Sequence, residues 1–158
     1  MPKIPSAEAK ETLYRVAMDK ITSMLDGESN EIARMATVSS ILAGDFDYFY
    51  WTGFYRVVDG VLVVGPYQGT PGCLRITLDR GVCGAAASRK KTILVPDTHA
   101  FPGHIACDAR SLSEIVVPVL DAAGNVLAVL DVDSDQLSAF DAIDQKWLET
   151  IIATVFAE

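Results

Sequence analysis

Residues 46–67 read FDYFYWTGFYRVVDGVLVVGPY, and this stretch decides the fold. The segment Phe46–Val58 is dense in aromatic and β-branched residues, which predicts a strand, and Val61–Tyr67 predicts a second strand. Asp59-Gly60 between them suits the two-residue turn of a β-hairpin. The stretch therefore predicts an antiparallel hairpin in the middle of the chain.

The sequence after this hairpin predicts four more strands. They are Cys73–Leu78, Thr92–Val95, Ile115–Leu120 and Asn125–Asp133. The Gly-Thr-Pro-Gly turn at 69–72 leads into the first of them, and Gly81 opens a short helix through Ser88. The turn at 121–124, Asp-Ala-Ala-Gly, joins the last two strands and requires antiparallel pairing, because it is too short for a parallel crossover.

Helices are expected at both ends of the chain. Ser6 suits the N-cap of a helix to about Leu25, and a second helix fits Asn30–Ala43, with Gly44 as its terminator. Ser138 suits the N-cap of a final helix over about 139–157. The two N-terminal helices (about 6–43), the sheet with its long loop (about 46–134) and the last helix predict one α+β domain over 1–158, with helices packed on a mainly antiparallel sheet of about six strands.

Composition excludes several classes of protein. The chain has 158 residues, of which 50% are hydrophobic, and a net charge of −8. No basic run offsets that charge, which argues against nucleic acid or an anionic membrane as partner. Without a signal-peptide or membrane-span pattern we expect a cytosolic protein with reduced cysteines, and three cysteines do not make a disulfide framework.

The segment Pro96–Glu114, PDTHAFPGHIACDARSLSE, holds both histidines and one cysteine, and its prolines and Gly103 argue against a helix. A loop of this length within a compact domain is usually functional. We therefore expect a reactive site here, framed by the neighbouring strands.

The three cysteines are not equivalent. Cys107 lies among polar loop residues, three positions after His104, where a neighbouring imidazolium would favour thiolate. Cys83 lies in the first turn of a predicted helix, where the dipole also favours thiolate, so it competes for the role of nucleophile. Cys73 has no local activator.

Metal binding and hydrolysis are weaker alternatives. Possible ligands are Asp97, His99, His104, Cys107 and Asp108, but their spacing matches no zinc pattern. We expect neither a metal nor an organic cofactor. A cysteine hydrolase that pairs Cys107 with His99 or His104 is a further alternative.

Three acids and two aromatic residues flank the loop. Asp131 and Asp133 are two apart in a strand and share one face, and Glu114 enters another strand. The three acids either face solvent or converge on a pocket, where they could hold an ammonium group or supply a proton. Trp51 and Tyr55 also share one strand face and could form an apolar wall for a small ligand.

The residues also carry a family likeness. The segments DRGVCG (79–84), LVPDTHAFPGHIACDARSLSEIVVPV (94–119) and VLAVLDVDS (126–134) resemble the free methionine-(R)-sulfoxide reductases, which are single GAF-domain enzymes. The likeness runs from about Trp51 to Leu148. It implies a GAF fold, and a homodimer as GAF domains often form.

The resemblance implies a thiol redox cycle. Cys107 matches the nucleophile, which becomes a sulfenic acid, and Cys73 matches the resolving cysteine, with Cys83 as alternate resolver or active-site thiol. A thioredoxin-like dithiol then reduces the disulfide.

The resemblance also implies how the substrate, free methionine sulfoxide, is held. Glu114, Asp131 and Asp133 match the acids that hold its ammonium and sulfoxide oxygen, and Trp51 and Tyr55 match the pocket for its methyl end. The helix start at Gly81 and Val82 suits its carboxylate. His99 and His104 would shape the loop or tune its thiol. The alternative from another class is a non-catalytic GAF module that binds a small ligand as a sensor.

Overall fold

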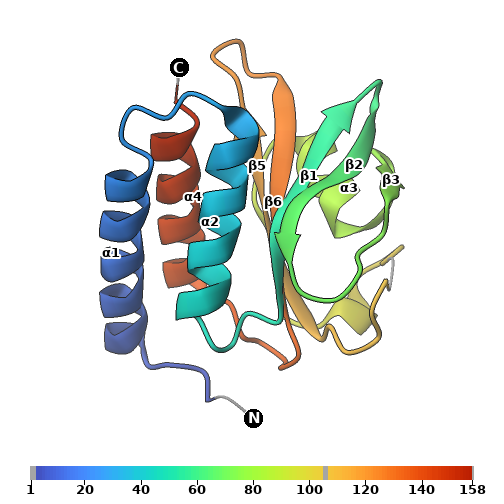
Figure 1. The fold of residues 1–158 in the computed structure, drawn as a ribbon. Helices are drawn as coiled ribbons and strands as arrows, with labels where there is room; N and C mark the ends of the chain where they lie inside the picture. The colour runs from blue at the N-terminus through green and yellow to red at the C-terminus, as the bar shows by residue number, and fades with distance from the viewer. Residues whose placement is uncertain (1–2, 105–106, 158) are drawn as a thin grey trace.

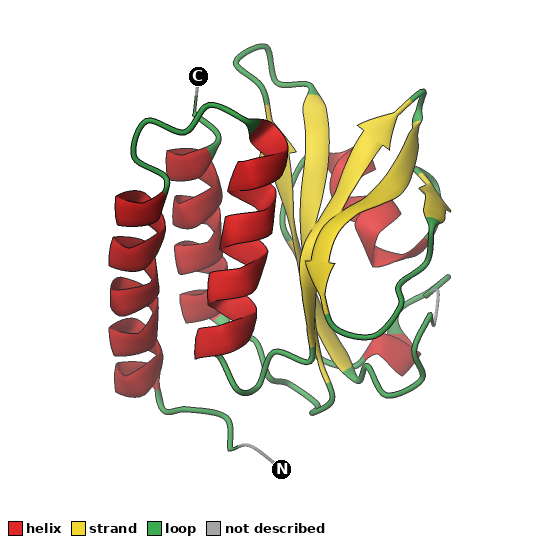
Figure 2. Ribbon diagram, viewed as in Figure 1, coloured by secondary structure: helices red, strands yellow, loops and turns green. Residues whose placement is uncertain are grey.

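The computed structural model describes residues 3–104 and 107–157. They form a six-stranded antiparallel sheet with helices on both faces (Figures 1 and 2). The strands are β1 (Trp51–Val58), β2 (Val61–Gln68), β3 (Arg75–Thr77), β4 (Ile93–Val95), β5 (Ser113–Leu120) and β6 (Val126–Ser134), in the order β3-β2-β1-β6-β5-β4. The helices are α1 (Ala7–Met24), α2 (Glu31–Asp45), α3 (Gly81–Arg89), the 3₁₀ turn η1 (Thr98–Ala100) and α4 (Ala142–Val155). The predicted α+β architecture is confirmed.

The helices form layers around the sheet. Helices α2 and α4 cover one face and α1 packs outside them, whereas α3 lies on the opposite face (Figure 1). Two apolar cores result, one between the sheet and α2/α4, the other between the sheet and α3. None of the helices in the described ranges combines the length and the apolarity that crossing a bilayer requires.

The hairpin at 51–68 forms as predicted. Asp59 (φ 50°) and Gly60 (φ 79°) both adopt positive φ, as a type I′ turn requires, and Val58 pairs with Val61. Strands β5 and β6 are likewise antiparallel neighbours, and β6 inserts between β5 and β1. The central strands of the sheet therefore come from two hairpins laid side by side.

The first predicted strand is too long, because the aromatic run at its start belongs to a turn. Phe46 N–H still donates to Leu42 at the end of α2, and Phe49 N–H donates to Phe46 O. The Phe46 and Phe49 rings stack, Tyr48 packs edge-to-face against both, and all three are buried in the core beneath the helices. These residues are aromatic because their side chains fill the core. Strand propensity alone does not distinguish this cause from a strand.

Two predicted helix boundaries are also wrong. Helix α2 continues through Gly44 to Asp45, and α4 begins at Ala142, not after Ser138. Asp141 is the N-cap of α4, because its side chain accepts from the N–H groups of Ile143 and Asp144 while Asp144 returns a bond to Asp141 N–H. The predicted N-cap at Ser6 is confirmed, and Asn30, which the sequence analysis placed inside the second helix, caps that helix through its side chain.

A buried polar network ties the two ends of the chain together. Lys10 of α1 lies 2.6 Å from an Asp144 oxygen, and the hydroxyls of Tyr14 and Tyr48 donate to the other oxygen of the same carboxylate. Lys10 also donates to Ala139 O. The network fixes α1 and the segment before β1 to the start of α4.

The long loop is held at both ends by backbone bonds. Thr98 N–H donates to Leu112 O, Leu112 N–H donates to Ser134 O, and Ser138 N–H donates to Pro96 O. Strand β5 begins at Ser113, so Glu114 lies within the strand and not in the loop. The loop thus leaves and re-enters the sheet at fixed points beside β6.

Candidate functional site

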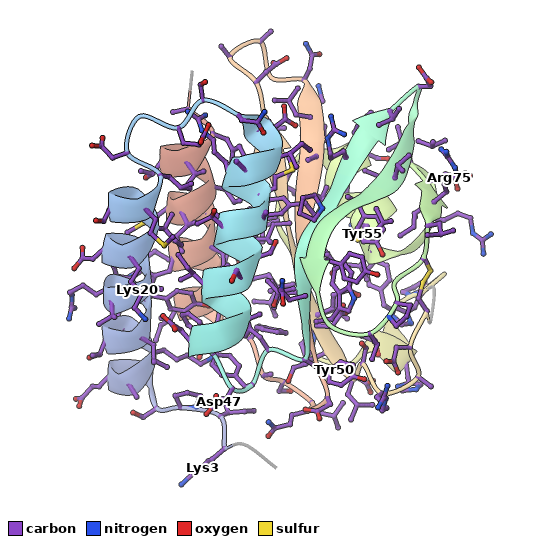
Figure 3. All side chains as sticks on the ribbon, viewed as in Figure 1. Lys3, Lys20, Asp47, Tyr50, Tyr55 and Arg75 are labelled. Carbon is purple, nitrogen blue, oxygen red and sulfur yellow. A yellow bond between two sulfur atoms is a disulfide. The ribbon has the colours of Figure 1, made fainter. Side chains whose placement is uncertain are left out.

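A pocket lies on the α3 side of the sheet, between β1, β6, β5 and the long loop. Its empty volume is about 550 Å³, which includes open solvent at the mouth. Figure 3 shows Tyr55 on this side of the sheet. The lining residues are Trp51, Tyr55, Thr70, Pro71, Gly72, Ile76, Gly81, Val82, Cys83, His104, Cys107, Asp108, Ser111, Glu114, Asp131 and Asp133. Every residue that the family likeness assigned to catalysis or substrate binding lies on this surface except Cys73, which is bonded to Cys107. Of the residues considered as metal ligands, Asp97 and His99 lie outside the pocket.

Strand register brings the acids and the tryptophan together. Asp133 of β6 pairs with Trp51 of β1 on one side and with Glu114 of β5 on the other. Asp131, two residues earlier and therefore on the same face, pairs with Gly53. The antiparallel order β1-β6-β5 thus gathers side chains that are far apart in the sequence into one row.

The three acids are buried with no lysine or arginine lining the pocket. Burial raises the pKa of Glu114 well above its ordinary value, and the nearby Asp131 and Asp133 raise it further. Burial likewise raises the pKa of Asp133 and of Asp131. The pocket therefore holds protons on its carboxyl groups at pH values where exposed acids are ionised.

Asp131 also has an unused hydrogen-bonding atom. Its Oδ1 is buried and has no partner among the described residues. An orphaned buried carboxylate oxygen is costly, so a ligand that donates to it would be bound favourably. A primary ammonium is such a donor.

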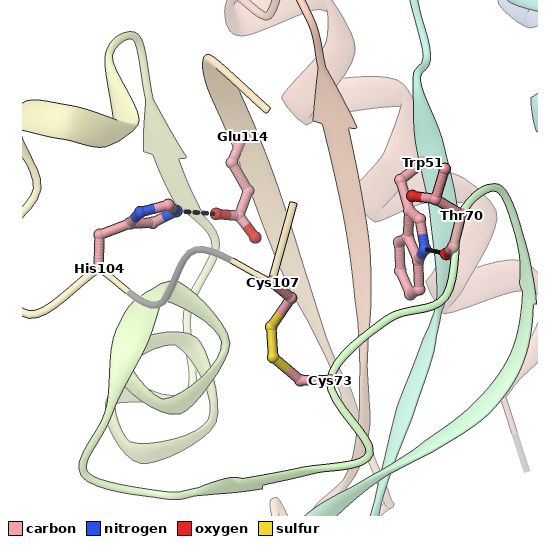
Figure 4. Close-up of a disulfide and its surroundings, with 6 residues drawn as sticks. All are labelled: Trp51, Thr70, Cys73, His104, Cys107 and Glu114. Atoms are coloured by element: carbon pink, nitrogen blue, oxygen red, sulfur yellow. Dashed lines mark hydrogen bonds and ion pairs between the residues drawn. A yellow bond between two sulfur atoms is a disulfide. The ribbon is translucent and has the colours of Figure 1, made fainter. Parts of the chain in front are cut away.

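Cys73 and Cys107 form a disulfide at the mouth of the pocket, with their Cα atoms 5.5 Å apart (Figure 4). Cys107 is exposed, and Cys73 is partly buried. A sulfur of Cys107 can thus meet both a ligand in the pocket and a reagent arriving from solvent.

Cys83 differs from the expectation based on its helix position. It is buried, and burial together with the negative field of Asp131 raises the pKa of its thiol, which outweighs the helix dipole. Cys83 is the free cysteine of the structure and contacts the Asp131 carboxyl group. The environment thus favours a neutral thiol over a nucleophile.

Only one group of side chains in the described ranges lies close enough together to share a metal ion. The Cys83 sulfur and carboxyl oxygens of Glu114 and Asp131 lie within 4.8 Å of one another, and all three residues are buried. The loop residues considered as ligands from the sequence do not form such a group in the described part of the chain. Burial favours the protonated forms of this thiol and of these acids, which disfavours the binding of a metal ion, because metal ligands must be deprotonated.

Trp51 and Tyr55 both line the pocket. Their rings stack with centroids 5.8 Å apart, and Tyr67 also stacks on Trp51, at 5.0 Å. Trp51 Nε1 donates to Thr70 O at 2.8 Å (Figure 4). The indole is therefore fixed, and it leaves the pocket an aromatic surface for a small apolar group.

The N-terminus of α3 opens onto the pocket through Gly81, Val82 and Cys83. Gly81 has φ +66°, a conformation that glycine adopts without strain. Arg80 at the N-cap makes no side-chain capping bond. The first N–H groups of α3 are thus available to an anion.

Asp108 organises the mouth of the pocket, a role that the sequence did not reveal. It accepts from Tyr50 Oη, Thr70 Oγ1 and the Arg110 side chain, and the Arg110 bonds hold its pKa well below the usual range. Asp108 therefore joins the long loop to the turn that carries Cys73. Its position next to Cys107 was the available signal, but its partners from β1 and the 69–72 turn depend on tertiary structure.

The two histidines occupy different environments. His99 is exposed, whereas His104 lines the pocket with Nε2 3.7 Å from Glu114 Oε1 (Figure 4). Burial, and to a smaller degree His99, lowers the pKa of His104. His104 is thus the histidine able to act on the site.

The comparisons with known proteins agree with this geometry. A family model described as "GAF domain" matches residues 33–155. GAF domain-containing protein A of Dictyostelium discoideum is 48% identical over 93% of this chain and 92% of that protein. The free methionine-R-sulfoxide reductase of Escherichia coli is 40% identical over 83% of this chain and 79% of that enzyme.

Solved structures show the same likeness. The free methionine-R-sulfoxide reductase of Neisseria meningitidis, determined in complex with its substrate, superposes with a TM-score of 0.88 at 36% identity, covering 98% of this chain and 92% of that chain. Family model, sequence and fold therefore coincide over most of the length. The chain belongs to the GAF domain family, among the free methionine-R-sulfoxide reductases.

Proposed function

We propose that this protein reduces free L-methionine (R)-S-oxide to methionine through Cys107. The observation that carries the proposal is the Cys73–Cys107 disulfide at the mouth of a pocket lined by three buried acids. A thiol-based reductase needs a nucleophile, a second thiol to release the oxidised product and an acid near the sulfoxide oxygen. The pocket provides candidates for all three, and the relatives from Escherichia coli and Neisseria meningitidis named above carry this activity in their names.

In the proposed first step, Cys107 Sγ attacks the sulfoxide sulfur while Glu114 protonates the departing oxygen. The oxygen passes to Cys107 as a sulfenic acid, methionine leaves with its sulfur reduced, and the proton of the Cys107 thiol goes to solvent. The raised pKa of Glu114 supports this role, because burial favours the protonated form that can act as an acid.

In the proposed second step, the Cys73 thiol condenses with the sulfenic acid. An S–S bond forms, and the oxygen leaves as water. A dithiol reductant of the thioredoxin type then attacks the disulfide and is itself oxidised. The exposure of Cys107 supports access for this reductant.

The pocket also supports a preference for the free amino acid. Asp131 Oδ1 would accept from the α-ammonium, with Asp133 beside it, and the first N–H groups of α3 at Gly81 and Val82 would donate to the α-carboxylate. Trp51 and Tyr55 would contact the methyl end. A methionine sulfoxide within a peptide lacks both charges, and the unpaired groups would disfavour it strongly.

The proposal also covers the cellular compartment and the oligomeric state. The cycle needs a compartment rich in reducing dithiols, which is the cytosol. We also propose a homodimer, the assembly expected for this fold, and sedimentation velocity of the full chain would show a monomer if this is wrong.

A coupled assay tests the activity. NADPH oxidation with thioredoxin and thioredoxin reductase should require free methionine (R)-S-oxide. The (S)-isomer and N-acetyl-methionine (R)-sulfoxide are matched control substrates that should give little turnover. Equal rates with the acetylated compound, or none with the free (R)-isomer, would contradict the proposed substrate.

A further inference from the structure

The proposed reaction leaves a proton to be returned to a buried group. Glu114 is only 5% exposed, and the acids nearest to it, Asp131 and Asp133, are buried as well. Once Glu114 has protonated the sulfoxide oxygen, it must regain one proton in each cycle. The neighbouring acids cannot act as a net source, because each would then need reprotonation itself.

His104 lies between Glu114 and solvent. Its Nε2 is 3.7 Å from Glu114 Oε1, and the two side chains are 15% and 7% exposed, respectively. Figure 4 shows the imidazole and the carboxyl group directed toward each other beside the Cys73–Cys107 disulfide. Catalytic contacts are often this long in a ligand-free protein and shorten when substrate binds.

The charge states of the pair suit proton transfer better than ion pairing. Burial raises the pKa of Glu114 and lowers that of His104, so both shifts favour the uncharged form of the side chain. A neutral imidazole can accept a proton at one nitrogen while giving one up at the other. The other ionisable groups lining the pocket are Tyr55 of β1, Cys83 of α3, Asp108 of the loop, and Asp131 and Asp133 of β6, and His99 lies outside it.

The disulfide form of the protein is the form in which Glu114 would have to be reprotonated. With the Cys73–Cys107 bond made, the steps in which Glu114 gives up its proton and water leaves are complete, so Glu114 regains its proton in this form. His104 contacts Glu114 in this same form.

We propose that His104 is a relay residue that returns one proton from solvent to Glu114 in each catalytic cycle. This inference rests on the proposed function. His104 touches Glu114 and not the reacting sulfur, so it accelerates the reloading of the acid and not the first attack on the sulfoxide.

The experiment compares His104→Ala with His99→Ala, a matched control because His99 is exposed in the same loop. Reduced protein is mixed with free methionine (R)-S-oxide under saturating dithiol, and methionine is followed over the first and later turnovers. His104→Ala should release the first methionine at the wild-type rate and then turn over slower by about 10²-fold, the lower end for acid–base catalysis. His99→Ala should match wild type in both phases.

Added imidazoles distinguish a relay from a structural role. The slow phase of His104→Ala should accelerate with imidazole concentration and should depend on the pKa of the imidazole used. His104→Gln, which keeps a polar side chain, should show the same slow phase. A normal later phase in both variants, a defect already present in the first turnover, or a defect that no imidazole relieves would overturn the relay. Absence of wild-type activity would instead overturn the proposed function.

Discussion

Cys83 and Cys107 show how burial and local charge decide the chemistry of one residue type. Cys83 occupies a helix start, yet burial beside Asp131 raises its thiol pKa, whereas Cys107 is exposed and lies opposite a second thiol. The sequence alone made both cysteines candidates for the nucleophile. Only the tertiary neighbours separate them, because desolvation depends on contacts that are distant in the chain.

Removing the second thiol should trap the intermediate. We expect Cys73→Ser to form one methionine per subunit and then stop, because the Cys107 sulfenic acid has no partner to condense with. Dimedone labelling followed by peptide mass spectrometry would locate the trapped group. Cys83→Ser is the control and should not trap it. Rapid continued turnover of Cys73→Ser would show that another thiol resolves the intermediate.

The buried Glu114 carboxyl group should lower the free energy of unfolding of the protein. An acid whose folded pKa lies above its unfolded value of about 4.5 destabilises the fold increasingly as pH rises through that window. Glu114→Gln should therefore unfold at a higher temperature than wild type at pH 7, by about 2–4 °C per kcal/mol, with a smaller difference at pH 5. Its kcat should fall by about 10²-fold or more.

Thermal unfolding of the reduced proteins from pH 5 to 8 measures this difference. The exposed substitution Asp26→Asn serves as control and should leave the curve unchanged. A Glu114→Gln protein less stable than wild type at pH 7 would mean that the carboxyl group is not held protonated in the fold.

At the scale of elements, local patterns predicted most of the sheet and failed at its edges. The hairpin turn at Asp59-Gly60 and the cap at Ser6 depend on a few adjacent residues, so the sequence predicts them. The aromatic turn after α2 and the cap at Asp141 depend on burial and on a reciprocal bond with Asp144. Tertiary contacts therefore decide whether an aromatic run is a strand or a turn, and which of two possible residues caps a helix.

The candidate site followed the same rule. The acids and cysteines could be indicated from spacing and family likeness, and register then brought them together. Asp108 and Thr70 could not, because their role is a contact between two loops that are 38 residues apart.

Gly53 permits the close approach of β1 and β2 beside the pocket. A Cβ at this position would overlap the Cα and Cβ of Tyr67. Gly53→Ala should destabilise the protein by at least the roughly 1–3 kcal/mol typical of overpacking, and should raise the KM by moving Tyr67 against Trp51. Gly44→Ala in α2 meets no atom within 4 Å and should be neutral or stabilising by less than about 1 kcal/mol. Urea unfolding of both variants tests this; equal stabilities would contradict it.

At the scale of the whole molecule, the Lys10–Asp144 network joins α1, the segment before β1 and α4. Both side chains are almost fully buried, at 1% and 0% exposure. Tyr14 and Tyr48 satisfy the carboxylate further, and burial beside it raises the pKa of both phenols. The network therefore fixes the outer helix α1 to the layer that carries the sheet and the site.

Breaking this pair from one side should be severe. Lys10→Met leaves a buried carboxylate without its cation, and we expect a loss of about 3–5 kcal/mol in the free energy of unfolding. Lys20→Met breaks the more exposed Lys20–Asp45 pair and should cost less than about 1 kcal/mol. Denaturant unfolding measures both, and similar losses would show that the buried pair has no special role.

The central claim is that Cys107 transfers the sulfoxide oxygen and Cys73 resolves it, and single-turnover stoichiometry with peptide mapping tests this most directly. Fully reduced protein is mixed with one equivalent of free methionine (R)-S-oxide, without reductant, and methionine and disulfide-linked peptides are quantified. We predict one methionine per subunit, one Cys73–Cys107 disulfide, and Cys83 recovered as a thiol. No methionine, or a disulfide that contains Cys83 in place of Cys73, would contradict the account.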